Sequence, residues 1–306
     1  MNYKRIIKSR SLRLKILRFF SFVPDETMLR FQYLIKTGRP LNLKNPQRFT
    51  EKLQWYKLHY KNPLMIPCVD KADVREYVES KGLGDILIPC YGVYDSADDI
   101  DWGSLPDQFV MKDTLGGGGT SVVIVKDKSS EDIEELKRKA DLWTAKDSRA
   151  KGSGREWPYY SGKKHRIIIE KYIASPDGAG GLQDYKFFCF GGKTAFLYVM
   201  GDRQVGESVK VSLFDRDFNK LPVHRVGDLD YAEAQMPQNY RALLETAEKL
   251  SSGFPHVRVD LYDVGGKIYF GEMTFYNASG YMQFDPDEFD IEIGKVFELT
   301  TFVGGK

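Results

Sequence analysis

The sequence has few of the residues that build disulfide frameworks or zinc sites. Among its 306 residues, only three are cysteine and four are histidine. Cys68, Cys90 and Cys189 are odd in number, form no Cys-x-x-Cys pair and lie far from the histidines in sequence. This excludes a disulfide framework or a zinc site as the expected organisation, and it favours a reducing compartment such as the cytoplasm.

An excess of charge of one sign and long apolar runs are also missing. The chain has 45 Lys and Arg against 43 Asp and Glu, which excludes a strongly basic nucleic-acid coat and an acidic disordered tail. We therefore expect no nucleic-acid partner. No stretch of about 18 apolar residues occurs, so we expect no membrane-spanning helix. The mean hydropathy of −0.42 is typical of a soluble protein, and the length suits about two domains.

The N-terminus is the one segment with lopsided charge. Residues 1–18 contain seven basic side chains and no acidic one, with isoleucines and leucines between them. Because lysine and arginine interrupt the apolar residues throughout, the segment is not a secretory signal. Two interpretations stay open. The segment contacts an anionic membrane or a polyanionic substrate, or it is a helix packed on the body with a solvated basic face. We treat residues 1–22 as a basic amphipathic segment.

Apolar spacing predicts helices and strands that do not alternate strictly. The predicted helices run from Asn45 to Tyr60, from Asp70 to Gly82, from a Ser129 or Ser130 cap to Trp143, and from Tyr240 to Gly253. Residues 146–165 are polar, basic and rich in glycine, which predicts a mobile loop. The predicted strands are residues 86–94, 108–113, 121–126, 166–173, 184–190, 193–200, 257–263 and 267–275. This mixture indicates an α+β fold, or an α/β fold with antiparallel sheets.

A glycine cluster after the strand at 108–113 is the first chemical signal. Lys112 near the end of that strand is followed by Gly116, Gly117, Gly118, Gly119, Thr120 and Ser121. Consecutive glycines let backbone N–H groups approach phosphate oxygens, and Lys112 adds a positive charge. The alternative is a plain flexible turn. A Walker A loop is excluded because no Gly-Lys-Ser/Thr follows, and a protein kinase is disfavoured because the glycines follow the lysine.

A carboxylate pair on a predicted hairpin is the second signal. Arg258, Asp260 and Tyr262 share one face of a strand, and Glu272 lies on the returning strand. A three-residue loop would set Asp260 opposite Glu272, whereas a two-residue loop would shift them by one residue. Two carboxylates at that spacing repel unless a cation lies between them, which suits Mg²⁺ bound through phosphates. The alternative is a surface pair of acids neutralised by Arg258.

An apolar strand that ends in charged residues is the third and weakest signal. The run from Arg166 leads into Glu170, and its backbone groups could face a purine. Further along, Asp184 could accept hydrogen bonds from ribose hydroxyls, and Lys186 could reach a phosphate. A buried strand with charged ends explains the same pattern.

Together these motifs resemble the TupA-like ATP-grasp family, which is named for teichuronopeptide synthesis and occurs among bacterial surface-polysaccharide proteins. The resemblance covers about residues 28–295 and leaves out the first 22 residues. It is carried by Asp184-Tyr185-Lys186-Phe187-Phe188, by Arg258-Val259-Asp260-Leu261-Tyr262, and by residues 41–46, 49–55, 69–78, 105–112 and 271–275.

The resemblance implies an ATP-grasp fold with nucleotide held between two α+β subdomains and the glycine loop as a lid. It implies an N-terminal domain at 23–105, a lid subdomain at 106–172 and a C-terminal subdomain with the metal site at 173–306. The implied contacts are Lys71 and Lys112 to phosphates, Glu170, Lys171, Tyr172 and Ile173 to adenine, Asp184 to ribose, Lys186 and Arg258 to the transferred phosphate, Asp260, Glu272 and Asn277 or Thr274 to magnesium, and Ser279 and Gly280 to the acceptor.

Three positions depart from the family pattern. Asp113 and the four glycines replace an Asn-His-Gly-Ser-Gly-like loop, and Lys171 replaces the second acid of the usual hinge. At the metal, Glu272-Met273-Thr274 replaces Glu-x-Asn. The lid contacts and the second metal's ligands are therefore the parts of the site that the resemblance defines least.

The implied activity is an ATP-dependent carboxylate–amine ligase with ATP and two Mg²⁺ ions. The family context favours a uronic-acid-bearing sugar nucleotide or glycan as the carboxylate, coupled to an amino acid or small amine. Lys151, Arg155, Lys163, Lys164 and Arg166 are candidates for contact with that anion. Residues 1–20 are a candidate contact with the inner face of the membrane or with glycan-assembly proteins. In both cases the alternative is a basic surface that only keeps the protein soluble.

Three other functions stay open at this point. A glycosyltransferase would use an Asp-x-Asp motif, for which Asp215-Arg216-Asp217 is the candidate, although a turn explains that tripeptide better. A non-catalytic nucleotide-binding scaffold and a phosphotransferase acting on a hydroxyl are the others. Retention of both Asp260 and Glu272 favours an enzyme over a scaffold.

Overall fold

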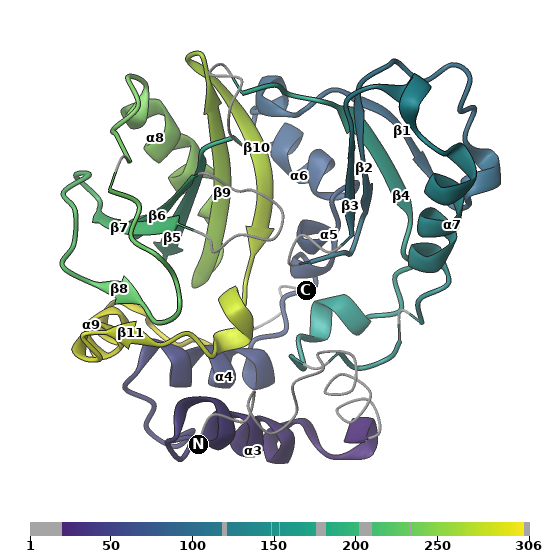
Figure 1. Ribbon diagram of the computed structural model, residues 1–306. Helices are drawn as coiled ribbons and strands as arrows, with labels where there is room; N and C mark the ends of the chain where they lie inside the picture. The colour runs from purple at the N-terminus through teal and green to yellow at the C-terminus, as the bar shows by residue number, and fades with distance from the viewer. Residues whose placement is uncertain are drawn as a thin grey trace.

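The computed structural model describes residues 20–117, 121–147, 149–152, 154–175, 182–201, 210–232 and 234–302. Two antiparallel sheets dominate it and lie on opposite sides of the short helices α5 (Met65–Val69) and α6 (Val74–Ser80), as Figure 1 shows. The α+β class and the preference for antiparallel sheets are confirmed. None of the helices among these residues is long and apolar enough to cross a membrane.

The smaller sheet has the strand order β1-β4-β2-β3. Its strands are β1 (Cys90–Tyr94), β2 (Phe109–Asp113), β3 (Val122–Val125) and β4 (Ile167–Lys171). Helix α7 (Ile133–Thr144) packs its buried residues on one face, against Phe109, Met111 and Ile169. Alternation along each strand then turns Lys112 and Glu170 to the opposite face. The sheet therefore presents a lysine and a glutamate to the rest of the molecule.

The larger sheet has the order β10-β9-β5-β6-β7. Its strands are β5 (Asp184–Phe190), β6 (Lys193–Gly201), β7 (Lys210–Asp215), β9 (His256–Val264) and β10 (Lys267–Thr274). Helix α8 (Tyr240–Ser251) covers one face, where Phe187 stacks on Tyr240 at 6.3 Å between ring centroids. The opposite face is half apolar and half charged along β5 and β9.

Two helices cover the apolar half of that opposite face. They are α4 (Phe49–His59) and α9 (Glu288–Val296), which lie under the larger sheet in Figure 1. Phe49 of α4 contacts Phe188 and Phe190 edge-on at 6.3 and 5.5 Å between ring centroids. The charged half, which carries Asp184 and Asp260, is left facing the smaller sheet. The candidate site therefore lies on the part of the larger sheet that α4 and α9 leave uncovered.

The remaining elements are short or lie at the margin. Helix α3 (Asp25–Thr37) packs on α4, and β8 (His224–Arg225) pairs with β11 (Phe284–Asp285). The 3₁₀ helices are η1 (Phe20–Phe22), η2 (Gly84–Ile86), η3 (Ala97–Asp99), η4 (Lys128–Ser130), η5 (Trp157–Tyr160) and η6 (Asn277–Gly280).

Four local predictions need correction. Helix α4 begins at Phe49 and not at Asn45, because the Glu51 side chain accepts from the backbone N–H of Gln47 and Arg48 ahead of it. Helix α7 is capped by Asp132 and not by a serine. The strand expected over 86–94 is confined to β1, an exposed edge strand. In the loop at 146–165, η5 forms and Arg155 is buried.

Candidate active site

The hairpin of β9 and β10 sets two carboxylates side by side. Its turn has two residues, because Val264 pairs with Lys267. That turn alone would leave Asp260 and Glu272 one residue out of register, as the sequence indicated. A β-bulge at Gly271 adds one residue to β10 and brings Glu272 directly opposite Asp260. The sequence therefore predicted the two possible registers of Asp260 and Glu272. It did not predict the bulge, which restores their pairing after a two-residue turn.

The guanidinium of Arg258 is the centre of the charged cluster on this hairpin. Its Nε and Nη2 atoms donate to the two oxygens of Asp260 at 2.6 and 2.7 Å, and Nη2 donates to Glu272 Oε1 at 2.8 Å. Nη2 also donates to Thr274 Oγ1 at 3.1 Å, and Nη1 donates to Asn277 Oδ1. All four acceptors converge on one buried cation, as expected for the ligands of a single site.

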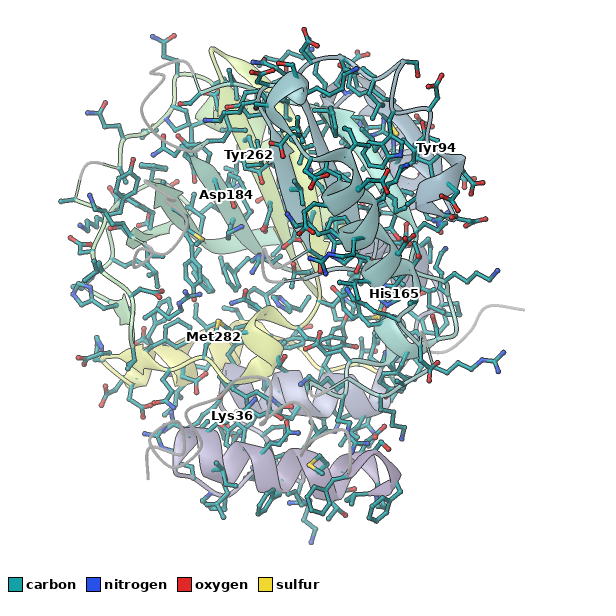
Figure 2. The ribbon with its side chains drawn as sticks, turned by 45° about the vertical axis from the view of Figure 1, so that its right-hand side comes forward. Lys36, Tyr94, His165, Asp184, Tyr262 and Met282 are labelled. Atoms are coloured by element: carbon teal, nitrogen blue, oxygen red, sulfur yellow. The ribbon has the colours of Figure 1, made fainter. Side chains whose placement is uncertain are left out.

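Lys186 on β5 joins this cluster from the neighbouring strand. Its Nζ donates to Asp184 Oδ2 and to Asp260 Oδ2, so one ammonium links two buried carboxylates. The other oxygen of Asp184 is buried and has no hydrogen-bond partner among the described residues. Figure 2 shows Asp184 and Tyr262 together on the larger sheet, and their Cα atoms pair across β5 and β9. Asp184 therefore keeps an unused acceptor at the edge of the charged cluster.

The opposite wall of the cleft comes from the smaller sheet and from α6. Lys112 Nζ donates to Glu170 Oε2 at 2.7 Å, and Arg75 of α6 reaches Glu170 Oε1 at 3.5 Å. Lys71 donates to the carbonyl oxygens of Asp113 and Gly116. Among the described residues no carboxylate forms an ion pair with Lys71, so its charge remains available to an anion. Arg75 is a site residue that sequence reasoning missed.

The two walls meet around a narrow enclosed space. It is lined by Lys71, Arg75, Leu87, Ile88, Lys112, Glu170, Phe270 and Gly271, and its volume is about 10 Å³. Such a space holds about one water molecule. The predicted residues Lys71, Lys112 and Glu170 therefore meet Phe270 and Gly271 of β10 around a space that is smaller than a nucleotide.

The charges of the cleft shift each other's pKa values. Burial alone would raise the pKa of Glu272, but Arg258, Lys186 and Lys71 lower it to about 2. Burial raises the pKa of Asp260 against the effect of Arg258 and Lys186. Burial also lowers the pKa of Lys71, partly offset by Glu272. Glu272 therefore stays ionised at neutral pH and can serve as a ligand for a cation.

The glycine segment begins on the smaller-sheet side of the cleft. At Gly116 a Cβ atom would lie 2.6 Å from Ser121 Cβ and 3.0 Å from Asp113 Cβ, so the loop closes on itself there and only glycine fits. Ser121 is buried and its hydroxyl accepts from Lys146. Gly117 follows, while the predicted contacts Gly118, Gly119 and Thr120 lie outside the described residues.

The predicted adenine hinge is divided between two places. Glu170 faces the enclosed space, whereas Lys171 and Tyr172 line a separate open depression of about 560 Å³ with Tyr91, Pro106, Asp107, Gln108, Lys126 and Asp127. Ile173 follows the end of β4. Glu170 and Lys171 are neighbours on β4 and so point to opposite faces of the sheet. The contact of residues 170–173 with adenine stays a prediction.

The predicted acceptor residues lie in a turn whose backbone carbonyls accept hydrogen bonds from side chains of α4. In η6, Ser279 O accepts from Lys57 Nζ at 2.7 Å, and Gly280 O accepts from Gln54 Nε2 at 2.7 Å. Ser279 Oγ donates to Glu156 in the segment before β4. Sequence reasoning missed Gln54, Lys57 and Glu156. No sequence signal marks them, because they meet this turn across more than one hundred residues of chain.

Several candidates for an anion contact are already paired within the chain. Arg155 is buried and donates to the carbonyl oxygens of Phe20, Ser21 and Val23 and to Asp25. Lys151 also pairs with Asp25, Lys163 with Asp73, and Arg166 with Asp70 and Asp73. These side chains attach loops to the body, and Lys164 is the one that lies exposed.

The Asp-x-Asp tripeptide is a turn, as the sequence favoured. Asp215 Oδ1 accepts from the backbone N–H of Asp217 and Asn219 at 2.9 and 2.8 Å. Arg216 between them pairs with Glu248 at 3.0 Å. The carboxylate of Asp215 is therefore used to close a loop next to β7.

The donor chemistry of the cluster fits magnesium bound together with phosphates. Oxygens of Asp260, Glu272 and Asn277 converge on the Arg258 guanidinium, and Mg²⁺ prefers oxygen ligands of this kind. Within the described parts of the chain, no three Asp, Glu, His or Cys side chains meet at metal-binding spacing. Magnesium commonly uses one or two carboxylates and completes its shell with phosphate oxygens and water. The pair Asp260 and Glu272 meets that requirement.

Comparison of the sequence with models of known protein families finds a match to one family. A family model described as TupA-like ATPgrasp matches residues 51–298, which is most of the chain. The match contains every candidate site residue discussed above and ends just after α9. No curated protein sequence matches the chain.

Solved structures with similar folds are distant in sequence. An L-amino acid ligase from Bacillus licheniformis is 16% identical, with 85% of this chain and 55% of that chain covered and a TM-score of 0.45. A D-alanine–D-alanine ligase from Helicobacter pylori is 16% identical, with coverages of 81% and 68% and a TM-score of 0.44. One from Bacillus anthracis, complexed with ATP, is 20% identical, with coverages of 68% and 55% and a TM-score of 0.39. This chain spans little more than half the length of the two Bacillus proteins.

Proposed function

Because the chain belongs to the TupA-like ATP-grasp family, we propose that it is an ATP-dependent carboxylate–amine ligase. The observation that carries the proposal is the meeting of cations and paired carboxylates between two sheets. Lys71 and Lys112 line the enclosed space beside Phe270 and Gly271 of β10, and Arg258, Lys186 and Lys71 together lower the pKa of Glu272 on the same strand. A triphosphate needs several fixed cations and a magnesium site, and this cleft offers both.

The chemistry follows from the poor reactivity of a carboxylate toward an amine at neutral pH. Transfer of the γ-phosphoryl group of ATP to a carboxylate oxygen gives an acyl phosphate and ADP. The amine nitrogen then attacks the acyl carbon, the bond to the phosphate oxygen breaks, and amide, phosphate and a proton are released. Negative charge develops on the phosphoryl oxygens during the first step, where fixed cations are most effective.

The residues of the cleft divide this work by position. Lys71 and Lys112 bind phosphates from the smaller-sheet side, and Lys186 and Arg258 hold the transferred group from the larger sheet. Asp184, with its unused buried oxygen, accepts from a ribose hydroxyl. Asp260, Glu272 and Asn277 would hold two magnesium ions, which supply neutralising charge to the phosphates when bound. Closure of the glycine loop excludes the water that would hydrolyse an acyl phosphate.

We further propose that the carboxylate belongs to a hexuronic acid in a sugar nucleotide or glycan, and that the amine is an amino acid or a small amine. What supports this is the association of the family with teichuronopeptide and other bacterial surface polysaccharides. The reaction would then take place in the cytoplasm before the polymer is completed. Contact of residues 1–20 with the inner face of the membrane remains part of this proposal.

The test combines the purified protein, ATP, Mg²⁺, uronic-acid sugar nucleotides and a panel of amines. We expect ADP release that depends on both acid and amine, and a product whose mass is the sum of both minus one water. A product heavier by one phosphoryl group would indicate a phosphotransferase. Release of ADP without any coupled product, or no binding of an ATP analogue, would contradict the ligase.

Two aspartates on the same strand give matched variants. Asp260→Asn removes a carboxylate from the cluster and should lower turnover at least a hundredfold. Without this ligand, magnesium binds less tightly and no longer neutralises the charge of the phosphates. Asp263→Asn changes an aspartate three residues along β9 whose carboxylate accepts from Asn239 Nδ2 at 3.3 Å. It should retain activity within about twofold. Equal loss in both variants would point to unfolding of the strand rather than to the site.

A further inference from the structure

Two polar side chains of α4 are buried against the turn η6, which follows β10. They are Gln54 and Lys57. Gln54 Nε2 donates to Ser279 O and Gly280 O at 3.1 and 2.7 Å. Lys57 Nζ donates to Ser279 O at 2.7 Å, to Gly154 O at 2.8 Å and to Gln54 Oε1 at 3.1 Å. Buried polar groups need partners, and most of these bonds go to the carbonyl groups of η6.

The backbone of this turn is left-handed and needs support from outside. Ala278 and Ser279 have φ values of +47° and +54°, and Gly280 follows at +68°. Left-handed backbone is disfavoured for residues with a Cβ atom, and it persists where the surrounding structure enforces it. The side chain of Ala278 is exposed, so it contributes little to that enforcement. The hydrogen bonds from Gln54 and Lys57 therefore stabilise the left-handed form directly.

Asn277, the first residue of the turn, belongs to the charged cluster. Its Oδ1 accepts from Arg258 Nη1, and its Nδ2 donates to Met282 Sδ. The amide oxygen is thereby directed at the guanidinium that also binds Asp260 and Glu272. Asn277 precedes the left-handed residues and Met282 follows them. A relaxed turn would therefore separate the two side chains and leave the amide free to rotate away from the cluster.

We propose that Gln54 and Lys57 are positioning residues for magnesium binding. They hold η6 in its left-handed form, and η6 fixes the amide oxygen of Asn277. The proposal rests on the ligase function, in which Asn277 holds magnesium together with Asp260 and Glu272. Neither Gln54 nor Lys57 is a ligand itself. Groups that orient metal ligands typically change metal affinity by about tenfold to a hundredfold when they are removed, which sets the size of the expected effect.

The experiment measures binding of AMP-PNP, a non-hydrolysable ATP analogue, to the full chain by calorimetry over a series of Mg²⁺ concentrations. Burial lowers the pKa of Lys57, so the main variant is Gln54→Met, in which the altered side chain does not titrate. Methionine keeps the length of the side chain and removes the hydrogen bonds to η6. We expect the Mg²⁺ concentration at half-saturation to rise about tenfold to a hundredfold.

Thr50→Val is the matched control on the same helix. Thr50 is buried, and its hydroxyl donates to Asp290 Oδ2 of α9 at 2.7 Å. The variant therefore also loses a buried hydrogen bond of α4, but it should keep the Mg²⁺ dependence of the wild type. An equal shift in Thr50→Val, or no shift in Gln54→Met, overturns the positioning role. Lys57→Met, which removes the other donor, takes the place of Gln54→Met if that variant does not fold.

Two further variants test the route through the turn. Asn277→Ala should itself raise the Mg²⁺ requirement, and adding Gln54→Met should then cost little more, because both changes act on one amide. Ala278→Gly should recover much of the loss in Gln54→Met, because glycine adopts a positive φ without support. Additive losses, an unchanged Mg²⁺ requirement in Asn277→Ala, or no recovery overturns the proposal. Failure of AMP-PNP to bind the wild type at any Mg²⁺ concentration would instead refute the ligase.

Discussion

His256 is a residue whose burial makes the stability of the protein depend on pH. The ring is fully buried, stacks on Phe190 at 4.6 Å and meets Phe49 edge-on at 5.1 Å. Its Nδ1 donates to the Cys189 carbonyl at 2.9 Å, while Nε2 has no partner within the part of the chain that the structure describes. Burial lowers the pKa of His256 from 6.5 to about 3. Between these values the unfolded chain binds a proton that the folded protein does not.

The sign of the effect follows directly. Below pH 6.5 this site should cost the folded protein up to about 1.4 kcal/mol of unfolding free energy per pH unit as pH falls toward 3. His256→Gln keeps a donor for Cys189 and removes the titration. Urea unfolding at pH 7, 6, 5 and 4 should therefore show the wild type losing stability faster than the variant. Parallel curves for the two proteins would contradict the assignment.

The site residues that the sequence predicted are charged residues placed inside otherwise apolar strands. Lys112, Lys186 and Asp260 are charges inside apolar strands, and such a pattern has few explanations other than a buried site. Arg75 and Glu156 lie in a helix and a loop where charge is ordinary. Only the three-dimensional contacts, which join α6 to β4 and the loop to η6, distinguish them from surface residues.

At the scale of elements, the bulge in β10 determines whether the carboxylates of Asp260 and Glu272 meet. A Cβ atom on Gly271 would lie 3.0 Å from Asp260 O and 3.1 Å from Tyr262 Cε2. Gly271→Ala must therefore push the backbone of β9 and disturb the pairing of Asp260 with Glu272. We expect a loss of about 1–3 kcal/mol in unfolding free energy and a larger relative loss of ATP-dependent turnover.

A second glycine provides the control for that experiment. Gly84 meets only the flexible side chain of Glu79, at 3.5 Å, so Gly84→Ala should change stability by less than about 0.5 kcal/mol. Thermal unfolding and turnover are measured for both variants. If Gly271→Ala retains wild-type turnover at a temperature where it is folded, the bulge is not what sets the carboxylate pair.

The sequence predicted the hairpins and the amphipathic helices well. It did not predict elements whose apolar residues lack a regular spacing. Gly191-Gly192 and Gly265-Gly266 mark two turns that the structure has, and the buried stripe of α8 follows the predicted spacing. Helices α3 and α9 and strand β7 were not foreseen. The cap of α7 was assigned to a serine because Asp132 and two nearby serines are all good caps, and propensity does not separate them.

At the scale of the whole molecule, charged contacts tie the smaller sheet to the rest of the chain. Arg75 and Tyr77 lie on α6, whose buried residues belong to the core of the larger sheet. Arg75 reaches Glu170 of the smaller sheet, and Arg166, next to that sheet, pairs with Asp70 and Asp73 ahead of α6. These ties hold the sheets around a space of about 10 Å³. We therefore expect nucleotide binding to require the sheets to move apart.

This requirement has a kinetic consequence. The observed rate of binding of a fluorescent ATP analogue, measured by stopped flow with Mg²⁺, should level off at high nucleotide concentration, because opening becomes limiting. Arg75→Gln removes a tie between α6 and β4 while Lys112 still neutralises Glu170, so it should raise the limiting rate about threefold to tenfold. Arg138→Gln, which breaks an exposed pair on α7, should leave that rate unchanged. A rate that rises linearly in the wild type would mean that the open cleft is already the dominant state in solution.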